Sequence, residues 1–185
     1  MRLSPVVALA VLLAAVPTLP AAAQGPNTVV ADLVSDVAEV EQKLVGLARA
    51  MPAESYAWRP AAGVRSVGEV FQHVAADNYL LPIFAGTPAP AATGIKGDAY
   101  ATVQAYETRS ADRATVIADL EQSFAHLRAA MTANATRSQA DTVALFGQKR
   151  TLQQLWVLTT THLHEHLGQA IAYARANNVV PPWSR

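Results

Sequence analysis

Residues 151–177 read TLQQLWVLTTTHLHEHLGQAIAYARAN, and their spacing predicts one long helix with a single inward face. Positions three and four residues apart share one side of a helix. The inward positions in this segment are Leu152, Leu155, Trp156, Thr159, His162, Leu163, His166, Ala170 and Tyr173. Asn177 and Asn178 end the helix, and the pair Pro181-Pro182 prevents it from resuming. The segment therefore predicts a helix from about Thr151 to Asn177.

Three more helical segments precede this one in the chain. The first spans about 28–50, and its apolar residues form a stripe at spacings of three and four. The second begins at Ser66, where Glu69 three residues later completes a capping box, and a proline marks its end at 82. The third begins near Ser110 and reaches about Asn134. Each of these segments predicts a helix with one buried side.

The connections between the helices define the predicted fold class. Residues 82–98 are rich in Pro, Gly, Ala and Thr and predict a loop, followed by a short helix over 99–107. Residues 135–149 are expected to form an irregular connection, and no strand pattern of useful length is present. The sequence therefore predicts an all-α four-helix bundle with a short extra helix between the second and third long helices.

The start of the chain has the features of a secretory signal. Arg2 provides a positive charge, residues 6–16 are apolar, and three alanines at 21–23 form a cleavage site. The apolar stretch is short and is followed by prolines, so it is poorly suited to span a membrane. We expect residues 1–23 to be a signal peptide and 24–185 to be one exported domain, periplasmic or secreted. The alternative is an uncleaved N-terminal anchor.

The composition excludes several classes of protein. The chain has 14 basic and 14 acidic residues, so it lacks the positive surface of a nucleic-acid-binding protein. It has no cysteine, so an exported form has no disulfide, and any metal must be held by His, Asp, Glu or water. The hydrophobic fraction of 51% includes many alanines, which favour helix.

Histidines provide the clearest chemical signal in the sequence. His162 and His166 are four residues apart, which places them about 6 Å apart on one helix face, where they can share one divalent metal. His164 is about 200° from His162 around the helix and is expected to face solvent. His73, in the middle of the second helix, is the best third ligand. Leu163 stands where a zinc protease of the HExxH type has its glutamate, so that class is excluded. The alternative is that these histidines are hydrogen-bonded core residues.

Three polar residues are weaker candidates for roles near this site. Asp77 lies one turn after His73 and Glu69 one turn before it, so either can orient an imidazole or act as a base. We favour a capping role alone for Glu69, and we leave Asp77 open between the site and a solvated helix surface. Gln169 shares the face of His162 and is expected to bind a ligand imidazole, to contact substrate, or to close the end of the bundle.

Several short motifs are spread along the chain: Trp58-Arg59-Pro60 with Gly63, Arg65-Ser66-Val67-Gly68-Glu69 with His73, Phe146-Gly147, His162-xxx-His166-x-Gly168-Gln169, Tyr173-Ala174-Arg175 and Pro181-Pro182. Together they resemble the DinB-like family, which is related to thiol-dependent transferases and to the N-terminal bundles of maleylpyruvate isomerases. The resemblance covers nearly all of the chain after residue 23. It implies an up-and-down-type bundle that tends to form homodimers, with one divalent metal (zinc, nickel or iron) held by His73, His162 and His166.

The function expected from these observations is metal-assisted hydrolysis, isomerisation or transfer on a small molecule by an exported protein. The general base is unidentified, with Asp77 as a weak candidate. The chain departs from typical relatives at Leu167, where they often carry a basic residue, and in its export signal, which disfavours a cytosolic thiol cosubstrate. Two alternatives stay open: a non-catalytic, metal-stabilised binding module of the cell envelope, and a metal-free bundle whose histidines only pack.

Overall fold

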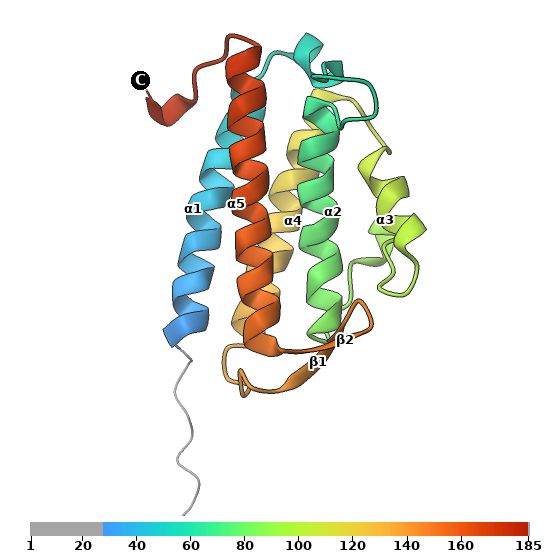
Figure 1. Cartoon of the computed structure of the whole chain (residues 1–185), viewed down its shortest axis with the longest axis vertical. Coiled ribbons are helices and arrows are strands. Elements are labelled where there is room, and N and C mark those ends of the chain that lie inside the picture. The colour runs from blue at the N-terminus through green and yellow to red at the C-terminus, as the bar shows by residue number, and fades with distance from the viewer. Residues whose placement is uncertain (1–27, 185) are drawn as a thin grey trace, which may run out of the picture.

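The computed structural model describes residues 28–184 and contains five helices, a β-hairpin and three short 3₁₀ turns (Figure 1). The predicted signal peptide lies outside the described residues. None of the described helices has the length and apolar character needed to cross a membrane. The helices are α1 (Thr28–Ala50), α2 (Val67–Phe84), α3 (Tyr100–Glu107), α4 (Arg113–Ala133) and α5 (Leu152–Ala176); the strands are β1 (Thr142–Leu145) and β2 (Gln148–Thr151); the turns are Ala53–Ala57, Ala91–Thr93 and Pro182–Ser184.

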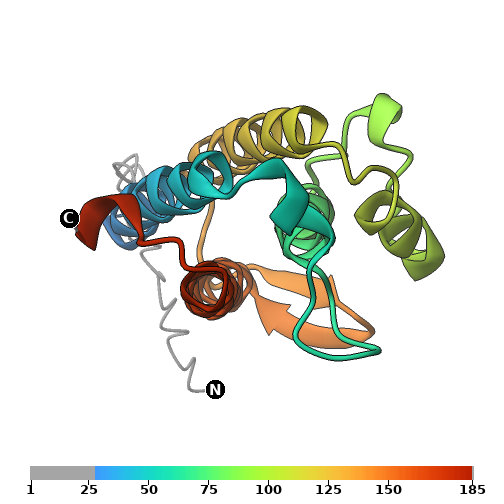
Figure 2. The same ribbon diagram turned by 90° about the horizontal axis from the view of Figure 1, so that it is seen from above.

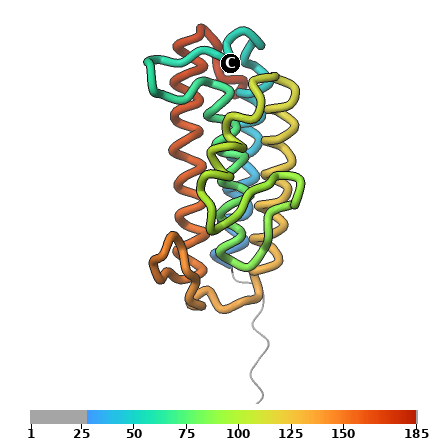
Figure 3. Tube along the Cα trace, turned by 90° about the vertical axis from the view of Figure 1, so that its right-hand side faces the viewer, coloured from blue at the N-terminus to red at the C-terminus, as the bar shows by residue number. Residues whose placement is uncertain are grey.

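Four long helices form the bundle, in which α1 and α2 each pack against both α4 and α5 (Figure 2). Arg113, at the start of α4, donates to the carbonyl of Met51, just after α1, at 3.0 Å. Arg137, after α4, donates to the carbonyl of Ala85, just after α2, at 2.7 Å. The helices α2 and α4 therefore run parallel. Strict up-and-down alternation is wrong for this chain, because the connection that contains α3 returns along the outside of α2 (Figure 3).

Capping residues begin the helices close to where the sequence predicts. Ser66 accepts from the Glu69 N–H at 3.3 Å, and the Glu69 carboxylate accepts from the Ser66 N–H at 2.7 Å, so the predicted capping box is confirmed. Asp112 caps α4, and Thr151 caps α5. The predicted end of α2 at Pro82 is wrong by less than a turn, since α2 continues to Phe84. Pro82 has no backbone N–H, so the helix loses one hydrogen bond there, but its last turn remains in place.

The connection 135–149 is not wholly irregular, because its second half starts a hairpin. β1 and β2 pair antiparallel from Thr142 opposite Thr151 to Leu145 opposite Gln148. The two-residue turn between them has positive φ at both Phe146 (48°) and Gly147 (77°), as tight hairpin turns require. The fold is therefore mostly helical with a small two-stranded sheet, and the all-α prediction is corrected. The strands have four residues each and β2 is largely exposed, so period-2 alternation is too short to detect.

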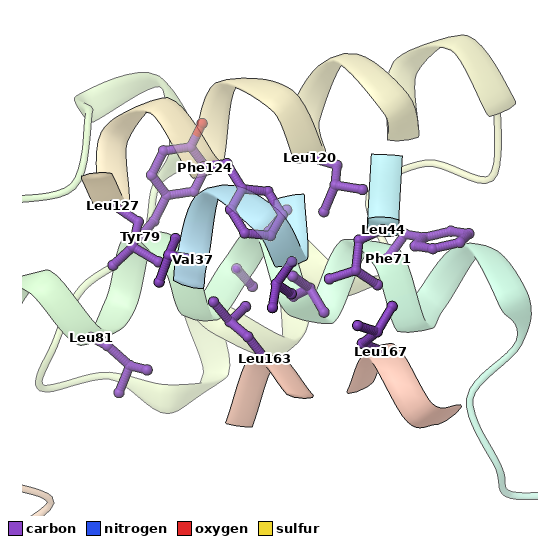
Figure 4. Packing of buried hydrophobic residues seen from close by; sticks show 14 of the residues in the cluster. Val37, Leu44, Phe71, Tyr79, Leu81, Leu120, Phe124, Leu127, Leu163 and Leu167 are labelled. Atoms are coloured by element: carbon purple, nitrogen blue, oxygen red, sulfur yellow. The ribbon is translucent and has the colours of Figure 1, made fainter. Parts of the chain in front are cut away.

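The core fills the space between the four long helices (Figure 4). α2 lies deepest and is buried on nearly every side, so its polar side chains need partners. Gln72 donates to the Asp119 carboxylate at 2.8 Å, and Asn78 donates to the Ser123 hydroxyl at 3.1 Å. His73, also on α2, is directed instead toward α5. Side chains from all four helices meet in the centre of the core, among them Val37, Leu44, Phe71, Leu120, Phe124, Leu127 and Leu163.

Candidate metal centre

The three predicted histidines lie together where α2 and α5 pack side by side. The Nε2 atom of His162 is 3.3 Å from Nε2 of His73 and 3.0 Å from Nε2 of His166. The rings of His73 and His166 have centroids 4.5 Å apart. One nitrogen from each histidine lies within 4.8 Å of the other two, so the group has the dimensions of a site for one ion. His73 is buried, whereas His162 and His166 are partly exposed.

Hydrogen bonds on the far side of two rings fix which nitrogen faces the centre. His73 Nδ1 lies 2.7 Å from Oε1 of Glu107, and His166 Nδ1 lies 2.8 Å from Oε1 of Gln169. An ionised carboxylate and an amide oxygen accept only, so both Nδ1 atoms donate. Neutral His73 and His166 rings therefore present unprotonated Nε2 lone pairs to the centre. Histidine ligands of metals are oriented in this way.

His162 lies between two such acceptors. A neutral ring can place at most one proton on Nε2, so one of its two close N···N contacts brings lone pairs together. Burial, followed by the neighbouring His166 and His73 rings, lowers the pKa of His162 to about 3. Burial also lowers the pKa of His166. A divalent cation placed between the three Nε2 atoms would relieve the contact, and the three-nitrogen donor set fits a first-row ion.

Asp77 belongs to this site rather than to the solvated helix surface. Its Oδ2 atom is 3.2 Å from Nε2 of His162 and 3.6 Å from Nε2 of His73. Burial raises the pKa of its carboxyl group to about 6. Glu69 has no such contact, because its carboxylate binds the Ser66 N–H and the Arg59 guanidinium. The capping role favoured for Glu69 is the one observed.

Glu107 is a site residue that the sequence analysis missed. It ends α3, lies 34 positions after His73, and is buried. Arg65 holds its carboxylate from the other side, with Nε and Nη2 at 3.2 and 3.1 Å from Oε2. Burial alone would raise the pKa of Glu107, but the bonds from His73 and Arg65 lower it below the ordinary value. No fixed sequence spacing connects Glu107 with His73 or Arg65. The only sequence feature that pointed to Glu107 is an acidic residue at the end of a short predicted helix.

A second chain of hydrogen bonds supports His166. Gln169 accepts from His166 and donates through Nε2 to the Tyr173 hydroxyl at 3.2 Å. Tyr173 in turn donates to the carbonyl of Arg65 at 3.2 Å, and its ring packs edge-on against Trp58 at 5.4 Å. Of the three roles expected for Gln169, ligand orientation is therefore the one that this geometry supports.

The remaining histidines lie outside the cluster. His164 is exposed, as expected, and its Nε2 atom lies 2.8 Å from Oδ2 of Asp36 on α1. His126 is on α4, where its ring packs 5.2 Å from the ring of Tyr79. These two residues therefore serve as internal controls for experiments on the three clustered histidines.

Comparison with known proteins identifies the family. The family model described as the DinB superfamily matches residues 37–170, a span that contains all three clustered histidines. The chain belongs to the DinB superfamily. A crystal structure of a DinB-like protein from Bacillus cereus ATCC 10987 is similar in fold, with a TM-score of 0.67, 12% identity, and coverage of 81% of this chain and 93% of that chain. No curated protein matches the sequence.

In this DinB-superfamily protein, replacement of Glu107 by glutamine is expected to weaken metal binding. The amide cannot supply the negative charge that orients and polarises His73, and such outer partners are worth about 10–100-fold in metal affinity. Competition with a chromogenic zinc chelator measures the change. The matched control is Glu165→Gln, which removes an exposed carboxylate next to His166 in sequence. Equal affinity of Glu107→Gln and wild type would show that Glu107 does not support the ligand.

Proposed function

We propose that this DinB-superfamily protein binds one divalent transition metal, zinc, nickel or iron, through Nε2 of His73, His162 and His166. The observation that carries the proposal is the convergence of three Nε2 atoms while Glu107 and Gln169 hold the Nδ1 protons of two rings. About one equivalent of metal is expected in mature protein purified without a histidine tag. Plasma mass spectrometry of that protein tests the proposal.

The proposed activity is metal-assisted hydrolysis, isomerisation or transfer on a small molecule. A divalent ion held by three neutral imidazoles keeps its full charge and acts as a Lewis acid toward water or a carbonyl. The residues of the chain supply the rest: Glu107 and Gln169 orient ligand rings, and Asp77 places a carboxylate within 3.2 Å of a ligand nitrogen. In the catalytic form of the proposal, Asp77 accepts a proton from the attacking group.

The position of Asp77 also favours a second candidate function. A carboxylate this close to two ligand nitrogens can serve as a fourth protein ligand. A tetrahedral site closed by four protein ligands is typical of structural metals, whereas catalytic sites keep an open position. The second candidate is therefore a non-catalytic, metal-stabilised binding module of the cell envelope.

Replacement of Asp77 by asparagine distinguishes the two functions. If Asp77 is the base at an open site, zinc content stays at about one equivalent and turnover falls by roughly 100-fold or more. Zinc content and hydrolysis of p-nitrophenyl acetate are measured together, with Asp36→Asn as the control, since Asp36 contacts His164 on another face. Loss of zinc from Asp77→Asn, with no hydrolysis by the wild type, would contradict catalysis and favour the closed site.

We also propose that the protein acts outside the cytoplasm, in the periplasm or after secretion, and forms a homodimer. Export is supported by Arg2, the apolar residues 6–16 and the alanines at 21–23. An exported enzyme lacks ready access to cytosolic thiols, which favours hydrolysis over thiol-dependent transfer. N-terminal sequencing of the protein recovered from cell fractions tests cleavage, and light scattering tests the dimer.

A further inference from the structure

A groove of about 670 Å³ lies between the hairpin and the outer face of α5, at the lower end of the bundle in Figure 1. Three of its lining residues are large, apolar and exposed: Phe146 at 60%, Val157 at 41% and Leu158 at 42%. Volumes of this size are typical of small-molecule sites, about 300–1,000 Å³. None of the three clustered histidines is among the residues that line the groove.

The groove adjoins the histidine site along α5. Thr161, at the upper end of the groove, immediately precedes His162 in the chain. Leu158 lies one turn before His162, and the two side chains are about 40° apart around the helix axis. The His162 side chain is 21% exposed, so part of its ring is open to solvent. A ligand that contacts His162 is therefore within about one helical turn of Leu158, which lines the groove.

Local structure keeps the groove open before any ligand binds. The ring of Phe146 packs against Phe84 of α2, with centroids 5.0 Å apart. The tight turn fixes its backbone at a φ of 48°. The floor is the first two turns of α5, whose start is fixed by the capping box between Thr151 and Gln154. A preformed apolar hollow loses little entropy on binding.

We propose that this groove binds the apolar chain of a substrate whose polar head lies at the three-histidine site. The inference rests on the proposed function and names its substrate class, small molecules with an alkyl or acyl chain. From Thr151 to Leu158 the floor is roughly 10 Å long, at 1.5 Å per residue, which suits a chain of about eight carbons. Proximity to the histidine cluster along α5 and a volume suited to one small molecule favour this occupant over another protein.

A series of alkyl hydroxamic acids with two, four, six and eight carbons tests the inference on the zinc-loaded protein. The hydroxamate head binds the metal, and calorimetry reports the dissociation constant of each compound. In the wild type, each added methylene that is buried should tighten binding by roughly threefold. In Leu158→Asp, the two-carbon compound should bind as in the wild type, while the gain with chain length should disappear. Val180→Asp is the matched control, because Val180 is an exposed valine outside the groove.

The possible results separate the two proposals. A flat series on zinc-loaded wild type, or an equal gain in Leu158→Asp and Val180→Asp, would overturn the inference alone. Failure of the wild type to bind zinc would overturn the proposed function and the inference with it. Light scattering adds a further check: a dimer that dissociates in Leu158→Asp would show that the groove is a subunit contact and would also overturn the inference.

Discussion

Replacement of His162 and His166 together by alanine is expected to reduce the metal content from one equivalent to below about one tenth. The double variant keeps a single imidazole, His73, and one nearby carboxylate, Asp77, which leaves too few donors for tight binding of a first-row ion. Both histidines are partly exposed on α5, a helix that alanine favours, so the variant retains the fold. Plasma mass spectrometry after desalting measures the metal, and circular dichroism confirms the helical content.

The other histidines provide the matched controls for this experiment. His164→Ala changes the same helix at an exposed position, and His126→Ala changes α4, so both variants should keep the full equivalent. The single variant His73→Ala should lose most of the metal, because it removes the ligand from the opposite helix. Full stoichiometry in His73→Ala would contradict the assignment. Equal metal in the wild type and the double variant would contradict the site as a whole.

Replacement of Phe124 by alanine is expected to lower the free energy of unfolding by about 3–5 kcal/mol. Phe124 on α4 is fully buried, and Figure 4 shows its ring among core side chains from the neighbouring helices. Removal of the ring loses its transfer free energy and leaves a cavity that well-packed helices fill only in part. Urea denaturation followed by circular dichroism measures the change.

Phe146→Ala is the control of the same residue type. Its ring is 60% exposed and contacts Phe84 at the surface, so the loss should be below about 1 kcal/mol. Alanine would adopt the same positive φ as Phe146 does, so the substitution changes the backbone strain little. Similar losses in the two variants would show that the core does not depend on Phe124 as the structure indicates.

The helices could be predicted from the sequence because their signals are local and long. The four long helices each repeat an apolar stripe over several turns, and capping residues such as Ser66 and Thr151 mark their starts. The hairpin could not be predicted, since its strands are too short for alternation to stand out, and the Phe146-Gly147 turn lacks the usual Asn-Gly or Asp-Gly pair. The parallel orientation of α2 and α4 depends on the path of the connection between them, which is a tertiary property.

The candidate site could be predicted only where its residues are marked by local helical spacing. The pair His162 and His166 follows from i, i+4 spacing, and His73 from its inward position on another helix. Asp77 was left open because helical spacing places it near His73 without deciding its partner. Glu107 was missed because its contact with His73 depends on how α3 packs against α2, and no periodicity in the sequence encodes that contact.

The contact between Glu107 and His73 joins the histidine cluster to a part of the molecule that is otherwise peripheral. α3 is short and lies outside the four-helix core, beside α2 (Figures 2 and 3). Docking of α3 therefore helps to orient the His73 ring, and in the proposed metal site the affinity for the ion is expected to depend on how firmly that helix is attached. Sequence changes in the crossover between α2 and α4 are thus expected to alter the affinity of the proposed site while the bundle that carries the three histidines stays the same.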